Sequence, residues 1–179
     1  VTARIPQQSF HITSLTKVTV PGLRAGYLTV PRGQLHHVLP RMRATTWMAT
    51  PLIFEIADRW LADGNVETLA TEQRALLAER QQLARRLLGH HTLESRPTSL
   101  HVWVSLPDAW RAEELQQQAE QEGLAITTAV PFMVERTPPP RRIRISLGAE
   151  QDIRRLEEGL ERLVVLLDEA PPPMMQIVY

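Results

Sequence analysis

The 179-residue chain contains no cysteine. This absence excludes disulfide bonds, thiolate metal sites and a cysteine nucleophile, although it does not identify a cellular compartment. An excess of charge is also lacking, because 20 Lys and Arg residues balance 20 Asp and Glu residues. A chain without net positive charge has no overall field that would attract a phosphate backbone, so DNA binding by this chain alone is disfavoured.

Long apolar runs are missing as well. No run approaches the roughly 18 residues of a membrane span, and no basic segment followed by an apolar one opens the chain. We therefore predict no membrane partner and a cytoplasmic location. The chain begins with Val1 rather than methionine, and its most informative motif lies within the first 17 residues, so we expect it to be part of a longer polypeptide.

The first third of the chain predicts two strands and then helices. Residues 9–13 and 23–30 are rich in β-branched and aromatic side chains, and Pro21-Gly22 is a turn signal between them. From residue 34 to about 88 the pattern is helical, with breaks expected at Pro40, Pro51 and Asp63-Gly64.

Residues 65–88 form the clearest predicted helix. Asn65 is the expected cap, Leu69, Leu76 and Leu83 recur at seven-residue spacing, and Gly89 ends the pattern. A free-standing coiled coil is the alternative. Because the pattern contains fewer than three clean heptads, it favours a helix that bridges two lobes.

The remainder predicts a small α+β lobe. Strands are expected at 99–106, 124–127 and 141–148, and helices at 112–122 and about 150–167, with a break at 138–140. No internal repeat is present. We predict an α/β chain divided into a lobe at 1–64, a long helix at 65–89, an α+β lobe at 90–170 and a tail at 171–179.

Lys17 is the only lysine in the chain. A primary amine can condense with an aldehyde, and hydroxyl groups with an arginine can bind a phosphate. Ser14, Thr16, Thr19 and Arg24 supply those groups nearby. Spacing alone also fits a solvated surface lysine in a chain that otherwise uses arginine.

The segment Ser14-Leu15-Thr16-Lys17 followed by Pro21-Gly22-Leu23-Arg24-Ala25-Gly26-Tyr27 resembles the cofactor-lysine signature of fold type I pyridoxal phosphate enzymes, in the aminotransferase class I and II group. The closest variant is that of MocR-type regulators of the GntR family, in which an aminotransferase-like domain follows a winged helix. The resemblance covers nearly the whole chain. It implies the carboxyl-terminal half of such a domain, with cofactor-lysine strands, a long interdomain helix and a small α+β domain.

The resemblance also implies roles for individual residues. Lys17 would form the internal aldimine with pyridoxal 5'-phosphate, and Ser14 and Arg24 would hold the cofactor phosphate. Arg24 has the alternative of a surface salt bridge, and Tyr27 has the alternative of packing beneath its strand.

Arg144 is a second candidate. Along the strand at 141–148, Arg142, Arg144 and Ser146 share one face, while Ile143, Ile145 and Leu147 share the face expected to enter the core. An arginine can clamp a carboxylate through two parallel hydrogen bonds. The resemblance implies that Arg144 binds the α-carboxylate of the substrate. The alternative is a solvated arginine on an edge strand, which we expect for Arg141 and Arg142.

Other features support weaker hypotheses. We expect His36-His37 and His90-His91 to be surface histidines and predict no metal site, because adjacent residues do not share a helix or strand face. We expect Arg85-Arg86 and Arg154-Arg155 to be solvated. Trp47 and Met48 match the region where dimers of the family meet near the active site, and a buried core tryptophan is the alternative.

Three functions remain open. In the first, the parent protein is a regulator that senses pyridoxal phosphate or an amino compound. In the second, it is an aminotransferase acting on an amino acid and a 2-oxo acid. In the third, the chain is an inactive fragment. In the family a carboxylate for the pyridine nitrogen and a stacking aromatic residue precede the lysine, whereas here the first carboxylate is Glu55. We expect a homodimer, and DNA contacts only through an upstream winged helix absent from this chain. The segments TKVTVPGLRAGYL and MRATTWMATPL resemble the regulator branch more than they resemble stand-alone aminotransferases, which favours the regulator.

Overall fold

The computed structural model describes residues 2–134, 137–169 and 171. The chain folds into two compact units, divided between Gln73 and Arg74, and each is described by itself below. This boundary lies within the long helix α3 (Asn65–Leu88). The predicted division of the chain at residues 64, 89 and 170 stays a prediction. Of the predicted tail at 171–179, only Pro171 belongs to the described residues.

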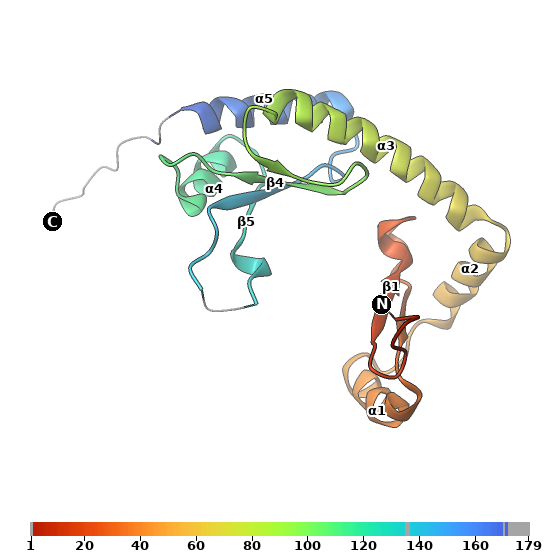
Figure 1. Ribbon diagram of the computed structural model, residues 1–179. Helices are drawn as coiled ribbons and strands as arrows, with labels where there is room; N and C mark the ends of the chain where they lie inside the picture. Colours follow the sequence, from red (N-terminus) through yellow and green to blue (C-terminus); the bar gives the residue numbers. More distant parts are fainter. Residues whose placement is uncertain (1, 135–136, 170, 172–179) are drawn as a thin grey trace. The chain divides into compact units, whose positions relative to one another are not determined.

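The first unit begins with a two-stranded antiparallel sheet (Figure 1). Strand β1 (His11–Ser14) pairs with β2 (Gly26–Thr29), with Ser14 opposite Gly26. Two short 3-10 helices, Leu15–Lys17 and Pro21–Leu23, connect the strands. Both strands are shorter than predicted, because Ser9 and Phe10 lie outside regular structure, Leu23 ends a 3-10 helix, and Arg24 and Ala25 follow it without regular structure. Leu23 and Ala25 are nevertheless buried, so their apolar character serves the core rather than a strand.

Two helices, α1 (Leu35–Thr46) and α2 (Pro51–Ala62), complete the first unit. Pro40 lies inside α1, so the predicted break there is wrong. The helix ends instead at Trp47, which has a positive φ of 57°. The core of this unit is small and consists of four buried residues with partly buried neighbours from α2: Leu15, Leu23, Ala25 and Ala57. None of the residues of α1 is buried.

Helix α3 spans 24 residues, as its leucine spacing predicted. Asn65 is its first helical residue rather than its cap. Gly64 precedes it with φ +75°, and the Gly64 carbonyl accepts a hydrogen bond of 3.1 Å from the Thr68 amide. Within the described part of the chain, no helix combines the length and the apolar character needed to cross a membrane.

The second unit contains a four-stranded antiparallel sheet in the order β3-β4-β6-β5. Its strands are β3 (Leu93–Glu94), β4 (His101–Ser105), β5 (Thr127–Thr128) and β6 (Arg142–Ser146). The sequence did not predict β3, whose two residues are too few for a recognisable alternation. Strand β5 starts later than predicted, because the Leu124 amide hydrogen-bonds at 2.8 Å to the Ala119 carbonyl and so belongs to the end of the preceding helix.

Helices α4 (Ala112–Gln121) and α5 (Ile153–Asp168) and the C-terminal part of α3 cover one face of this sheet (Figure 1). The predicted alternation along β6 is confirmed, since Ile143, Ile145 and Leu147 are buried. An apolar stripe on α5 packs onto that face because its leucines recur every three or four residues. The buried residues of α5 are Leu156, Leu160, Leu163, Leu166 and Leu167.

Candidate functional site

Lys17 ends a short 3-10 helix that Ser14 caps. The Ser14 Oγ accepts a hydrogen bond of 3.1 Å from the Thr16 amide and donates one of 3.0 Å to the Ala25 carbonyl. It also lies 2.9 Å from the Thr16 Oγ1. This hydroxyl therefore joins the end of β1 to the start of β2, and it fixes the turn that carries the lysine.

The other end of the turn is fixed by Leu15. Its carbonyl accepts hydrogen bonds from the amides of Val18 at 3.1 Å and Thr19 at 2.9 Å, and from the Thr19 Oγ1 at 2.8 Å. The Leu15 side chain is buried while Lys17 is exposed. The apolar side chain therefore anchors the turn in the core and leaves the amine at the surface.

Arg24 adopts a left-handed backbone conformation, with φ 49° and ψ 24°. This conformation is uncommon for a residue with a Cβ atom. Its neighbours Leu23 and Ala25 are both buried, so the reversal between them turns the arginine outward. Among the described residues, neither the Arg24 guanidinium nor the Lys17 amine has an ion-pair partner.

Tyr27 follows on β2 and is half-buried. Its ring meets the ring of Phe54 on α2 edge to face, with centroids 5.6 Å apart. The phenolic oxygen is buried, and no described residue hydrogen-bonds to it. The predicted packing beneath the strand fits the ring, while the hydroxyl has an unused donor and acceptor.

The groups on this turn fit two ends of pyridoxal phosphate. Lys17 offers a primary amine to an aldehyde, and hydroxyls with the Arg24 guanidinium suit a phosphate. The unpartnered Tyr27 hydroxyl is a further polar group. The turn has no carboxylate to pair with the pyridine nitrogen of the cofactor. The first carboxylate of the chain, Glu55, is exposed and paired at 2.8 Å with Arg59.

Arg144 lies in the middle of the second unit's sheet, opposite Trp103 on β4 and Thr127 on β5. Its guanidinium carbon lies 4.2 Å from the centroid of the Phe132 ring. Phe132 in turn meets Trp103 edge to face, with centroids 5.4 Å apart. Phe132 therefore holds the arginine by a cation–π contact, and Trp103 supports Phe132 edge to face.

The Arg144 Nε atom is buried, and no described residue accepts a hydrogen bond from it. The arginine lines a cavity of about 700 Å³ together with side chains from β3, β4 and the loop between them. Polar lining residues include Ser95, Ser99 and His101. An unpartnered guanidinium facing a polar cavity is suited to an anionic group such as a carboxylate.

The structure corrects the expectation for the neighbouring arginines. β6 lies between β4 and β5 and is not an edge strand. Arg142 pairs with Glu94 at 2.8 Å, and Arg141 pairs with Asp108 at 2.8 Å and donates to the carbonyls of Pro107 and Trp110. Arg142 therefore binds strand β3, and Arg141 binds the loop after β4.

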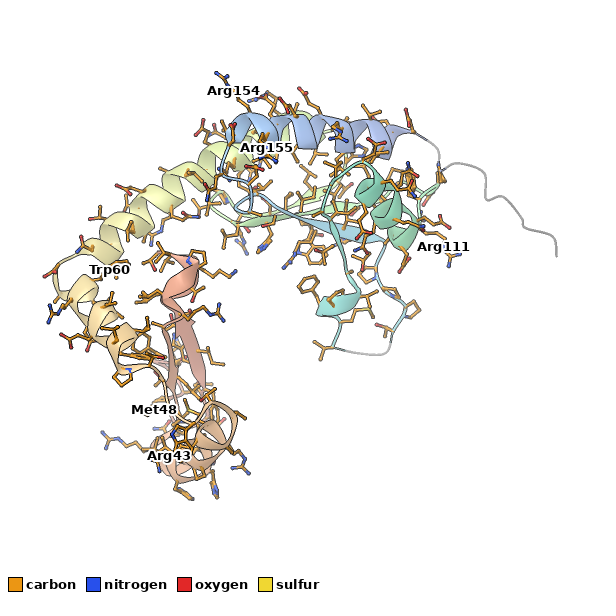
Figure 2. All side chains as sticks on the ribbon, turned by 180° about the vertical axis from the view of Figure 1, so that it is seen from behind. Arg43, Met48, Trp60, Arg111, Arg154 and Arg155 are labelled. Carbon is orange, nitrogen blue, oxygen red and sulfur yellow. The ribbon has the colours of Figure 1, made fainter. Side chains whose placement is uncertain are left out.

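Ion pairs also occupy two of the arginines that were expected to be solvated. Arg86 pairs with Glu157 at 3.2 Å, and Arg155 pairs with Glu150 at 3.5 Å. Arg154 and Arg155 project from the first turn of α5 (Figure 2). All these pairs are largely exposed, so each contributes little to stability.

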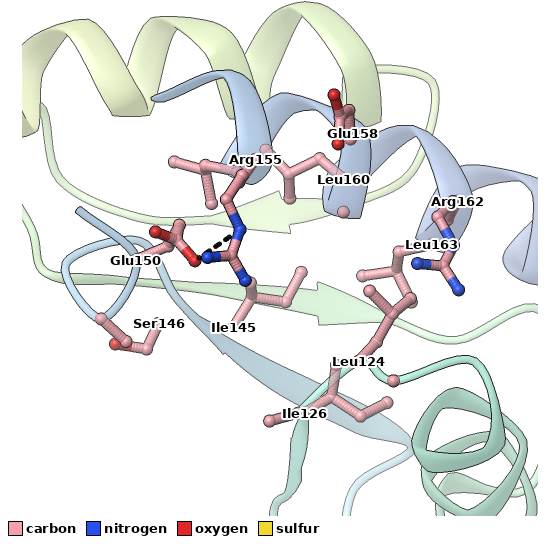
Figure 3. A pocket seen from close by; sticks show the side chains of 15 residues that line it. Leu124, Ile126, Ile145, Ser146, Glu150, Arg155, Glu158, Leu160, Arg162 and Leu163 are labelled. Carbon is pink, nitrogen blue, oxygen red and sulfur yellow. Dashed lines mark ion pairs between the residues drawn. The ribbon is translucent and has the colours of Figure 1, made fainter. Parts of the chain in front are cut away.

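A second cavity of about 380 Å³ lies on the helix-covered side of the sheet, between α5 and residues 123–126 (Figure 3). Leu124, Ile126 and Leu163 give it an apolar wall. Its two lining arginines are already paired, since Arg155 binds Glu150 and Arg162 binds Glu122, while Glu158 adds a carboxylate to the lining. It contains none of the predicted site residues.

Trp47 and Met48 are exposed, with 79% and 64% of their surface accessible. The alternative of a buried core tryptophan is therefore wrong for this structure. Both residues lie in the link between α1 and α2, where Figure 2 labels Met48. Large exposed apolar side chains of this kind are typical of a contact surface.

The histidine pairs differ from each other. His36 and His37 are exposed on α1, as predicted. His91 is different, because only 10% of its side chain is exposed, and it lies 3.2 Å from Asp168.

The sequence also gave no sign of Phe132, since its contact with Arg144 depends on how the loop after β5 folds back over the sheet.

Comparison with known proteins places these observations in a wider setting. No protein-family profile matches the chain. Among curated proteins, the uncharacterized HTH-type transcriptional regulator YdeF of Bacillus subtilis is 31% identical over 164 residues, which cover 92% of this chain and 36% of that protein. The regulator YdfD of the same organism is 23% identical over 89% of this chain and 33% of its own length. The chain thus spans about a third of the length of the curated relatives it matches.

Several solved structures with the same fold are aminotransferases. The kynurenine aminotransferase of Pyrococcus horikoshii matches with a TM-score of 0.79 at 19% identity, over 90% of this chain and 41% of that chain. A multiple substrate aminotransferase of Thermococcus profundus matches with a TM-score of 0.76 at 16% identity, over 88% of this chain and 40% of that chain. At these identities the likeness establishes the fold. The chain therefore has a type I aminotransferase fold, spans about two fifths of the solved chains that share it, and is related in sequence to HTH-type transcriptional regulators.

Proposed function

We propose that this chain is part of the aminotransferase-like sensor domain of a MocR-type transcriptional regulator and that it binds pyridoxal phosphate through an aldimine at Lys17. The observation that carries the proposal is the turn from Ser14 to Arg24. It presents the only primary amine of any side chain in the sequence beside hydroxyls and an arginine that forms no ion pair with the described carboxylates. When bound, the cofactor supplies an aldehyde and an electron-withdrawing ring.

The residues of the turn would bind the phosphate of the cofactor as well as its aldehyde. Arg24 and the Ser14 hydroxyl would hold the phosphate through charge-assisted hydrogen bonds. Ser14 can take this role by redirecting its proton from the Ala25 carbonyl, which keeps the amide of Leu15 as a partner at 3.1 Å. Residues of the parent protein outside this chain would supply the carboxylate for the ring nitrogen.

Arg144 would bind the carboxylate of an amino acid. Its unpartnered Nε atom and its position over Phe132 support this role, because a guanidinium braced from one side offers its free edge in a fixed direction. An amino acid or amine is accordingly the proposed effector. A cytoplasmic location, a homodimer and DNA binding through an upstream winged helix complete the proposal for the parent protein.

An aminotransferase acting on an amino acid and a 2-oxo acid is the second candidate, favoured by the fold of the structural neighbours. In that case Lys17 would also move the proton between substrate carbon and cofactor as a general acid and base. Turnover of an amino acid with a 2-oxo acid by the parent protein separates the two functions.

The proposal can be tested with unusual clarity because the chain has only two primary amines, Lys17 Nζ and the amino terminus. Pyridoxal phosphate is added to the full chain, the visible spectrum is recorded, and the product is reduced with borohydride and mapped by mass spectrometry. We expect one adduct per chain, located at Lys17. Lys17→Arg keeps the positive charge but removes the primary amine, so it serves as the matched control and should give no specific adduct.

Two other outcomes would contradict parts of the proposal. An adduct shared with the amino terminus, or one that persists in Lys17→Arg, would mean that the chain has no specific cofactor site. A specific Lys17 adduct that is unaffected by Arg24→Gln would remove Arg24 from the phosphate site while leaving the lysine's role in place.

A further inference from the structure

Two adjacent histidines and one aspartate meet where helices α3 and α5 end. The Nε2 atoms of His90 and His91 lie 3.3 Å and 3.2 Å from the same oxygen atom, Oδ1 of Asp168. One ligand atom from each of the three residues lies within 4.8 Å of the others. Neither the cofactor turn nor the Arg144 cavity uses any of these groups.

His91 has a buried nitrogen without a hydrogen bond. Its side chain is only 10% exposed, and the Nε2 atom, although close to Asp168, has no partner with hydrogen-bond geometry among the described residues. A buried polar atom without a hydrogen bond costs free energy, and an ion bound to the nitrogen would remove that cost. Burial lowers the pKa of His91, with the neighbouring His90 acting in the same direction and Asp168 opposing it.

Two of the three separations between ligand atoms match a tetrahedral metal ion, and all three atoms lie within 4.8 Å of one another. Bonds of about 2.0–2.1 Å from such an ion to histidine nitrogen and carboxylate oxygen leave neighbouring ligand atoms about 3.4 Å apart. The two measured nitrogen–oxygen separations, 3.3 Å and 3.2 Å, are close to this value. The rings of His90 and His91 are tilted by 43° with centroids 4.1 Å apart, so both can aim a nitrogen at one point.

The surrounding backbone favours a cation at this place. Helix α3 ends at Leu88, directly before the histidines, and α5 ends at Asp168. The carbonyl ends of two helices therefore meet here, and each carries a partial negative charge. The cluster is also held in place, because the His91 amide bonds to the Leu88 carbonyl at 2.9 Å and the Trp110 Nε1 bonds to the Glu169 carbonyl at 2.9 Å.

We propose that His90, His91 and Asp168 form a binding site for a divalent transition metal ion of the zinc type, with a fourth position left for water or a ligand. Two imidazoles and one carboxylate are a ligand set that zinc and cobalt accept. The site links the end of α3 to the end of α5. An ion there would stabilise the second unit by binding only its folded form.

The experiment uses the full chain without an affinity tag, stripped of metal with a chelator and titrated with Zn²⁺ and Co²⁺ by calorimetry. We expect one ion per chain. Asp168→Asn and His91→Gln should each weaken binding at least ~10-fold. The matched control is the double variant His36→Ala, His37→Ala. It removes the other histidine pair, whose rings lie 3.9 Å apart but which has no described carboxylate beside it, and it should bind as the unaltered chain does.

A second measurement does not depend on how the variants fold. In an NMR titration of the unaltered chain with paramagnetic Co²⁺, the ring signals of His90 and His91 should broaden first, before those of His11, His36, His37 and His101. Equal broadening of all six histidines would overturn the proposal. Unchanged affinity in folded Asp168→Asn and His91→Gln variants, checked by circular dichroism, would overturn it as well.

Discussion

The Arg80 guanidinium donates a hydrogen bond of 2.6 Å from Nη1 to the carbonyl oxygen of Leu147, which lies 67 residues later in the chain. It also donates to the carbonyls of Glu150 and Gln151. The side chain is only 3% exposed. One charged side chain on α3 thus satisfies three carbonyls of the loop after β6.

Replacing this arginine should destabilise the second unit. Arg80→Met keeps much of the volume but leaves three carbonyls without partners, so we expect a loss of about 3 kcal/mol in the free energy of unfolding. Urea unfolding followed by circular dichroism measures the effect. Arg74→Met, on an exposed position of the same helix, is the control and should change stability little. Equal effects of the two changes would show that the hydrogen bonds of Arg80 are not stabilising.

Gln81 plays a comparable role toward the Arg144 cavity. Its Nε2 donates to the carbonyls of Ser99 and His101 at 2.7 Å and 3.2 Å, and its Oε1 accepts from the Ser95 hydroxyl at 2.5 Å. Gln81→Met should cost about 2 kcal/mol because two carbonyls and a hydroxyl lose a partner. Gln82→Met, at an exposed neighbouring position, is the control. A midpoint of thermal unfolding that is the same for both variants would contradict the prediction.

Gly123 ends α4 in a left-handed conformation, with φ +74°. A Cβ atom there would meet no other atom within 4 Å, so Gly123→Ala tests the backbone conformation alone. We expect a loss of about 1 kcal/mol in unfolding free energy. Gly33→Ala is the control, since that glycine has the same free space without a positive φ. Chemical denaturation of both variants decides the point, and a Gly123→Ala chain as stable as Gly33→Ala would refute it.

Arg144 should bind carboxylates better than Arg142 does, if the proposed function holds. Arg144→Lys loses the planar guanidinium that rests on Phe132, so we expect amino acid binding to weaken about 10-fold. Arg142→Lys, whose side chain already pairs with Glu94, should leave binding unchanged. An NMR titration that follows the indole N–H signal of Trp103, which lines the same cavity and is present in both variants, gives the affinities. Equal affinities in the two variants would assign the carboxylate to another group.

Trp47 and Met48 give a test of self-association. Replacing both exposed residues with serine removes a large apolar surface, and we expect the self-association constant to fall about 10-fold. Sedimentation over a range of protein concentrations measures it. Leu61→Ser is a suitable control because Leu61 is also exposed, at 49%, but lies at the other end of α2. Self-association that survives the double substitution would place the contact elsewhere.

Much of the local structure was predictable from the residues. Helix α3, the alternation along β6 and the end of α4 at Gly123 were all predicted correctly, because each depends on side-chain periodicity or on a backbone preference of a single residue. The break expected at Pro40 was wrong. A proline removes one hydrogen bond but does not stop a helix when the flanking residues continue it.

The sequence by itself determined the lysine turn, the periodic helices and the family resemblance, since these depend on residues close together in the chain. Only the tertiary structure decided that β6 lies between two strands, that Phe132 folds over Arg144, and that His91 is buried beside Asp168. Each of these relationships joins residues that are not neighbours in the chain. Their pairing is set by how helices and strands pack together, and no local pattern of residues encodes that packing.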